Sequence, residues 1–156
     1  MAENEQVQQQ FGVQRMYVKD ASLESPLGVE VFTKQWQPKL NVDLNTKSSK
    51  VGEENYEVVL TVTVTAKLDE ETALLIEVQQ AGLFLVKGIE GENLRQALGI
   101  MGPSLLFPYL REVIDSLAVK GGFPPIGLQP VNFEALYRQA AQQAADQAAP
   151  QPETVN

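Results

Sequence analysis

The chain has 156 residues, a net charge of −8 at neutral pH, and neither cysteine nor histidine. This length predicts one domain with its own core. The missing residue types exclude disulfides and thiolate chemistry and remove the commonest general base and metal ligand, so we expect no enzyme, no metal and no cofactor.

The acidic balance disfavours nucleic acid as a partner, because phosphates need a basic surface, and it favours basic partners. Met1–Gln10 is polar and lacks the apolar stretch of a signal peptide, and no later run reaches the length of a transmembrane helix. We therefore expect a cytoplasmic protein without direct membrane insertion. One domain at residues 10–145 is expected between disordered tails at residues 1–9 and 146–156.

The first predicted strand is Phe11–Leu23, in which the apolar residues stand mainly at odd positions. Arg15 and Lys19 fall on this apolar phase, which is typical of an edge strand protected by inward-pointing charges. The strand is expected to end at Ser25–Gly28, where Pro26 removes a backbone donor.

The segment Val29–Pro38 contains Phe32 and the only tryptophan, Trp36, but shows no regular period. It is either a loop held on the core by its aromatic side chains or the aromatic wall of a binding groove. The following segment, Leu40–Thr46, alternates with apolar even positions and follows Pro38, which predicts a short edge strand.

The segment Tyr56–Leu85 predicts an antiparallel hairpin with a polar turn at Leu68–Glu71. In both halves the even positions are largely apolar, so one face is expected to be buried and the other wet. The wet face is expected to carry Glu57, Leu75 and Glu77.

A long helix is predicted over Leu94–Leu117, where apolar residues recur at helical spacing. Prolines within residues 102–108 predict a kink there, and Gly121-Gly122 predicts the end of the helix. Its apolar stripe is broad. The helix is therefore either an ordinary core helix or one that packs on the sheet and on a second subunit.

The segment Phe123–Pro130 is apolar but too rich in proline for a helix or a strand interior, so it must lie on the core or form a contact surface. Asn132 is a suitable N-cap for a last helix from Phe133 to about Ala145. The expected fold class is therefore α+β, with a four-stranded antiparallel sheet followed by a long kinked helix and a short C-terminal helix.

No segment has the spacing of a chemical site. Gly88–Gly91 lacks the lysine and the third glycine of a phosphate loop, and the pairs Glu53-Glu54 and Glu70-Glu71 are expected to be solvated. The sequence offers two surfaces instead. The acidic one is borne by strands and consists of Asp20, Glu24, Glu57 and Glu77 beside Leu75. The apolar one is irregular and consists of Val31, Phe32, Trp36 and Phe123–Leu128.

Several motifs of the chain resemble the SecB family of bacterial protein-export chaperones, and the resemblance runs in order from about Phe11 to Leu136. The motifs are VFTKQWQP at 31–38, YEVVL at 56–60, EETA at 70–73, EVQQ at 77–80, LFPY at 106–109 and PVNF at 130–133. The resemblance implies a homotetramer, built as a dimer of dimers. It also implies ATP-independent binding of unfolded preproteins, which are then delivered to the SecA motor ATPase.

The resemblance also implies which residues bind these partners. The expected SecA-binding residues are Asp20, Glu24, Leu75 and Glu77. The expected client-binding residues are Phe32, Trp36, Leu40, Val42, Leu44, Phe123, Ile126 and Leu128. The alternative is a SecB-like adaptor or chaperone dedicated to one client, such as a toxin–antitoxin component.

Overall fold

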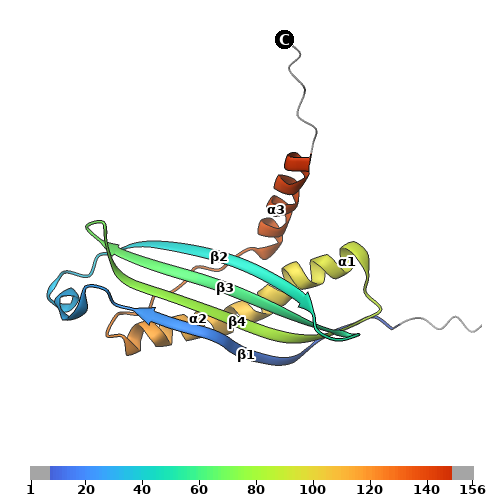
Figure 1. Cartoon of the computed structure of the whole chain (residues 1–156), viewed down its shortest axis with the longest axis horizontal. Helices are drawn as coiled ribbons and strands as arrows, with labels where there is room; N and C mark the ends of the chain where they lie inside the picture. The colour runs from blue at the N-terminus through green and yellow to red at the C-terminus, as the bar shows by residue number, and fades with distance from the viewer. Residues whose placement is uncertain (1–7, 149–156) are drawn as a thin grey trace, which may run out of the picture.

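The computed structural model describes residues 8–148 and has one antiparallel sheet with the strand order β1-β4-β3-β2 (Figure 1). The strands are β1 (Gln10–Glu24), β2 (Lys39–Lys50), β3 (Asn55–Leu68) and β4 (Glu71–Lys87). A 3-10 helix, Gly28–Thr33, lies between β1 and β2. The remaining elements are α1 (Gly91–Gln96), a π-helical turn (Ala97–Met101), α2 (Gly102–Lys120) and α3 (Phe133–Ala148). The predicted α+β class, four-stranded sheet and two helical segments are confirmed.

The hairpin of β3 and β4 forms the centre of the sheet, as predicted. On the side that faces α2, every second residue of β3 from Val58 to Ala66 is fully buried. The turn between the strands is formed by Asp69 and Glu70, whose φ angles are 48° and 70°. Two left-handed residues in succession give a turn whose twist matches that of the flanking strands, so it fixes the register of the hairpin.

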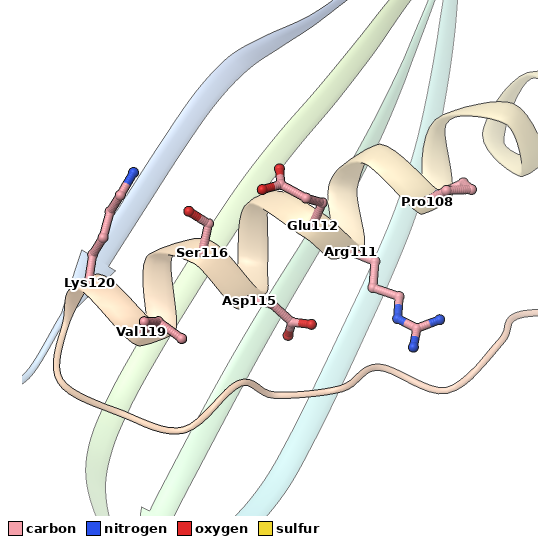
Figure 2. Close-up of a pocket in the computed structure, with 7 residues that line it drawn as sticks. All are labelled: Pro108, Arg111, Glu112, Asp115, Ser116, Val119 and Lys120. Atoms are coloured by element: carbon pink, nitrogen blue, oxygen red, sulfur yellow. The ribbon is translucent and has the colours of Figure 1, made fainter.

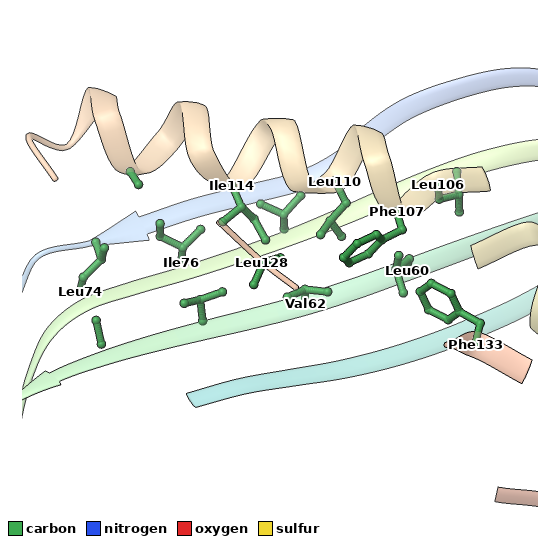
Figure 3. Close-up of a cluster of buried hydrophobic side chains, with 14 of the residues drawn as sticks. Leu60, Val62, Leu74, Ile76, Leu106, Phe107, Leu110, Ile114, Leu128 and Phe133 are labelled. Carbon is green, nitrogen blue, oxygen red and sulfur yellow. The ribbon is translucent and has the colours of Figure 1, made fainter. Parts of the chain in front are cut away.

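Helix α2 packs on the central strands and closes the core (Figure 3). Leu106, Leu110 and Ile114 of α2 are fully buried against this side of the sheet, which also contributes Val62 and Ile76. Because α2 contacts β4 and β3 extensively and β1 only slightly, the helix side of both edge strands is much less covered. Figure 1 shows α3 projecting away from the sheet past the β2 edge.

The interruption of the long helix lies at the π-helical turn, which precedes the expected kink at residues 102–108. Pro103 stands in the first turn of α2, directly after the π-helical turn. Helix α2 continues through Pro108, which is exposed together with Ser104, so the carbonyl that Pro108 leaves without a donor lies on the wet side. Asn132 caps α3 as predicted, by accepting a hydrogen bond from the N–H of Ala135 at 3.0 Å.

Strand β1 is an edge strand, as predicted, but its alternation is broken by two β-bulges. One bulge lies between Val13 and Arg15, and the other lies between Val18 and Asp20. The prediction that odd-numbered residues of β1 face the core is therefore correct at both ends of the strand. It is wrong between the bulges, where Tyr17 points to the face away from α2. We call this face the outer face. Arg15 and Lys19 also lie on it and are not inward-pointing charges, because each bulge shifts the alternation by one residue.

Candidate functional site

A hollow of about 470 Å³ lies between the helix side of β2 and the loop that joins α2 to α3. Leu40, Val42 and Leu44 form its floor on β2, and register places them on the helix side opposite Ala66, Val64 and Val62. Leu40 and Val42 remain 47% and 46% exposed because α2 does not extend over this edge. The loop supplies the opposite wall, with Ile126, Gly127, Leu128, Gln129, Pro130 and Val131. We call this hollow the β2 groove.

The loop that walls the β2 groove is anchored to α2 by Asp115. Its Oδ1 atom accepts hydrogen bonds from the N–H groups of Ile126 and Gly127, each at 3.0 Å. Figure 2 shows Asp115 on the side of α2 along which this loop runs. Gly127 has a φ of 65°, a conformation that favours glycine, and the buried Leu128 follows it. An apolar segment without regular structure thus acquires a defined position beside β2.

An aromatic cluster lies at the start of the same loop. Its centre is the buried Phe123, whose ring centroid is 5.0 Å from that of Trp36 and 5.5 Å from that of Phe32. Val31 is buried and holds the segment before β2 on the core, whereas Phe32 is 56% exposed. The segment is therefore attached to the core by its aromatic side chains, as the first interpretation expects, and it also presents an exposed aromatic residue; the binding role stays a prediction.

The structure brings the eight expected client-binding residues together in two adjacent groups. Five of them line the β2 groove, namely Leu40, Val42, Leu44, Ile126 and Leu128. The other three, Phe32, Trp36 and Phe123, form the aromatic cluster. Val62 and Phe107 also line the groove, and sequence reasoning missed them because their apolar character indicated only a place in the core.

The four expected SecA-binding residues lie together on the outer face. Glu24 of β1 stands opposite Leu75 of β4, and Asp20 stands opposite Gln79, two residues from Glu77. Glu77 is oriented by Thr63 of β3, whose Oγ1 atom donates a hydrogen bond to Oε2 of Glu77 at 3.0 Å. We call Asp20, Glu24, Leu75 and Glu77 the acidic patch. It lies on the opposite side of the sheet from the β2 groove.

A polar bridge on the outer face was not anticipated from the sequence. The hydroxyl of Tyr17 donates to Oε2 of Glu57, and Nζ of Lys19 lies 2.8 Å from Oε1 of the same carboxylate.

Burial and the hydrogen bond to Glu57 raise the pKa of Tyr17 to about 12. The hydrogen bonds from Lys19 and Tyr17 hold the pKa of Glu57 below its ordinary value. Ionised Glu57 therefore stabilises the fold above the ordinary carboxyl pKa, and this contribution is lost as the pH falls through the lowered value. The signal in the sequence was the pair of charges, Arg15 and Lys19, that broke the apolar phase.

Within residues 8–148 no group of three or more acidic, histidine or cysteine side chains is arranged to hold a metal ion. In the same part of the chain, no helix combines the length and the hydropathy that crossing a membrane requires.

Comparisons with known proteins agree on one family. Residues 4–144 match the SecB family, described as preprotein translocase subunit SecB. The chain is 53% identical to the protein-export protein SecB of Hahella chejuensis, with 98% of each chain covered. It is 50% identical to the protein of the same name from Marinobacter nauticus, with 96% of this chain and 94% of that protein covered.

A solved structure supports the fold independently. The chain superposes on a SecB-like chaperone of Mycobacterium tuberculosis, which was solved in complex with a peptide from an antitoxin, with a TM-score of 0.62. The alignment covers 78% of this chain and 90% of that chain at 13% identity. At this identity the likeness extends to the fold alone.

The anchor at Asp115 can be tested directly by hydrogen exchange. In Asp115→Ala the amides of Ile126 and Gly127 lose a charged acceptor, and they should exchange about tenfold to a hundredfold faster, because such hydrogen bonds contribute about 1.5–3 kcal/mol. Asp115→Asn is the matched control, since it keeps an oxygen acceptor at the same position. Equal exchange in wild type and Asp115→Ala would show that the loop is held by other contacts.

Proposed function

This chain belongs to the SecB family of protein-export chaperones, and from that premise we propose how it works. It binds non-native preproteins in the β2 groove and on the aromatic cluster, keeps them unfolded without ATP in the cytoplasm, and delivers them to SecA through the acidic patch. The identity of 50–53% to proteins named for protein export favours this function over a chaperone dedicated to one client.

The observation that carries the proposal is the uncovered helix side of the edge strand β2. Among residues 8–148, the free edge of β2 has no neighbouring strand, so the backbone donors and acceptors along this edge are available to an extended chain. Added backbone hydrogen bonds give affinity without a sequence code, while apolar side chains of the client enter the adjacent groove. The loop rich in proline and glycine, Phe123–Val131, can adjust its side chains to different clients.

The acidic patch supports a separate partner. Leu75 is only half-buried and lies beside Glu24 and Glu77, and an apolar residue among charges is a common centre for a protein interface. Because the patch lies on the outer face, a client in the β2 groove does not block it. SecA and the client can then be bound at the same time, as delivery requires.

The outward side of α2 supports assembly of several copies into a dimer of dimers. Met101 at the end of the π-helical turn and Leu105 and Tyr109 of α2 stand on successive turns and are 51%, 42% and 55% exposed. A shallow hollow of about 690 Å³ lies farther along α2, and Figure 2 shows that side chains of both charges line it. It is lined by Pro108, Arg111, Glu112, Asp115, Ser116, Val119 and Lys120. A surface that carries both charges and apolar residues can complement a copy of itself.

On β1, Val13 and Val18 lie on the helix side of the sheet and are 40% and 46% exposed. A second copy that packs on this side would cover them together with the exposed stripe of α2. We expect light scattering at micromolar concentration to give the mass of about four chains, as a dimer of dimers has. A stable monomer at that concentration would exclude this assembly.

Client binding is tested by the double substitution Val42→Ser and Leu44→Ser. Affinity for an unfolded preprotein should fall by about tenfold or more, because burial of each apolar side chain contributes about 1.5–3 kcal/mol. Asp43→Ser is the matched control, since it lies between them and faces the outer side. Titration of the preprotein, with circular dichroism to verify folding, measures the effect. An unchanged affinity would place the client elsewhere.

SecA binding is tested by Glu77→Lys, which should abolish the interaction and leave client affinity nearly unchanged. Asp43→Lys is the control, because Asp43 and Glu77 both pair with Thr63 and stand in one row of the outer face, two strands apart. Each exposed charge pair contributes only about 0–1 kcal/mol, so wild-type binding should arise from several pairs and weaken with salt. An affinity for SecA that is unchanged both in Glu77→Lys and at high salt would contradict the proposal.

A further inference from the structure

We infer that Tyr17 and Lys19, acting through Glu57, are positioning residues that hold β1 where the acidic patch needs it. This inference rests on the proposed function of the acidic patch in binding SecA. The three residues do not belong to the patch themselves. They connect the edge strand that carries half of it to a strand on the far side of β4.

The bridge crosses β4 on the outer face. Tyr17 of β1 stands opposite Ala81 of β4, and Glu57 of β3 stands opposite Leu83 of β4. To reach Glu57, the side chain of Tyr17 must therefore pass over β4. Ala81 faces the outer side yet is fully buried, as expected beneath a side chain that crosses it. A small residue at this position leaves the path open, and the hydroxyl and the carboxylate meet on the other side.

The two halves of the acidic patch differ in how firmly the sheet holds them. Leu75 and Glu77 stand on β4, which has a hydrogen-bonded strand on each side. Asp20 and Glu24 stand on β1, which pairs with β4 alone. The second bulge interrupts this pairing directly before Asp20. The hydrogen bonds of Tyr17 and Lys19 to Glu57 therefore add a side-chain attachment of β1 at the point where the backbone pairing with β4 is interrupted.

The bridge also directs a positive charge away from the patch. Lys19 precedes Asp20 in the sequence, and a free ammonium group there would offset the charge of the Asp20 carboxylate. Its Nζ atom instead lies 2.8 Å from Oε1 of Glu57, toward β3. The same contact thus holds the bulged backbone and preserves the negative potential that a basic partner meets.

The first experiment compares Tyr17→Phe and Glu57→Gln with wild type in binding to SecA and to an unfolded preprotein. Tyr17→Phe keeps the ring and removes only the hydroxyl, and Glu57→Gln removes the charge that Lys19 contacts. We expect SecA affinity to fall about threefold to tenfold in each, a range common for coupled neighbouring residues, with preprotein affinity unchanged. Glu54→Gln is the control, because it breaks an exposed ion pair with Lys87, 3.4 Å long, elsewhere on the sheet. Unchanged SecA affinity in both bridge variants would overturn the inference.

A double-mutant cycle separates positioning from general stability. The variant Asp20→Asn lacks one of the carboxylates that the bridge positions. In this background Tyr17→Phe should therefore reduce SecA affinity clearly less than it does in wild type. A merely structural role would reduce affinity equally in both backgrounds and would lower preprotein affinity as well; either result overturns the inference. If Tyr17→Phe fails to fold by circular dichroism, Lys19→Gln, which leaves the tyrosine in place, carries the same cycle.

Glu77→Lys distinguishes failure of this inference from failure of the proposed function. If Glu77→Lys leaves SecA binding intact, the patch does not bind SecA, and the inference falls together with the proposal on which it rests. If Glu77→Lys abolishes binding while the bridge variants bind as wild type, only the inference falls. Weaker SecA binding in the bridge variants, with the smaller effect in Asp20→Asn, supports both.

Discussion

A single helix is narrower than a four-stranded sheet, and this mismatch organises the molecule. An α-helix with its side chains is about 10–12 Å wide, whereas strands are spaced about 4.8 Å apart, so one helix covers about two strands. Helix α2 occupies the two central strands and buries Leu106, Leu110 and Ile114 there. The apolar residues on the helix side of β1 and β2 are left for other partners. On β2 the anchored loop encloses the space only in part, and a groove results.

The two sides of the sheet consequently differ in character. The helix side is mainly apolar, and what α2 leaves open there suits chains that offer apolar side chains. The outer face mixes polar and apolar residues and carries charge in defined positions, because Thr63 orients Glu77 and Glu57 binds Lys19. A strand with alternating residues thus presents one chemistry to each side. The same four strands can serve two kinds of partner without competition between them.

Much of this architecture could be predicted from the sequence. Alternation in β3 and β4 is nearly strict, so the buried face of the hairpin was evident, as were the N-cap Asn132 and the outer position of Glu77. The bulges in β1 could not be predicted, because two insertions that compensate each other leave the pattern correct at both ends and disturb only Tyr17 and its neighbours. The π-helical turn could not be predicted either, because Pro103 is compatible with the first turn of a helix as well as with a kink. The anchor at Asp115 depends on where a distant loop comes to lie, which local patterns do not report.

The open edge of β2 has a consequence for the concentration at which such a protein can exist. An unpaired strand with apolar residues at alternate positions is a template for any extended chain, including an identical copy, and it is therefore an aggregation hazard. Lysines at its two ends, Lys39 and Lys50, and the overall charge of −8 oppose pairing between copies through mutual repulsion. The overall negative charge does not oppose a chain with basic segments in this way. The acidity of the protein thus opposes self-association at β2 and leaves the free edge of this strand open to other chains.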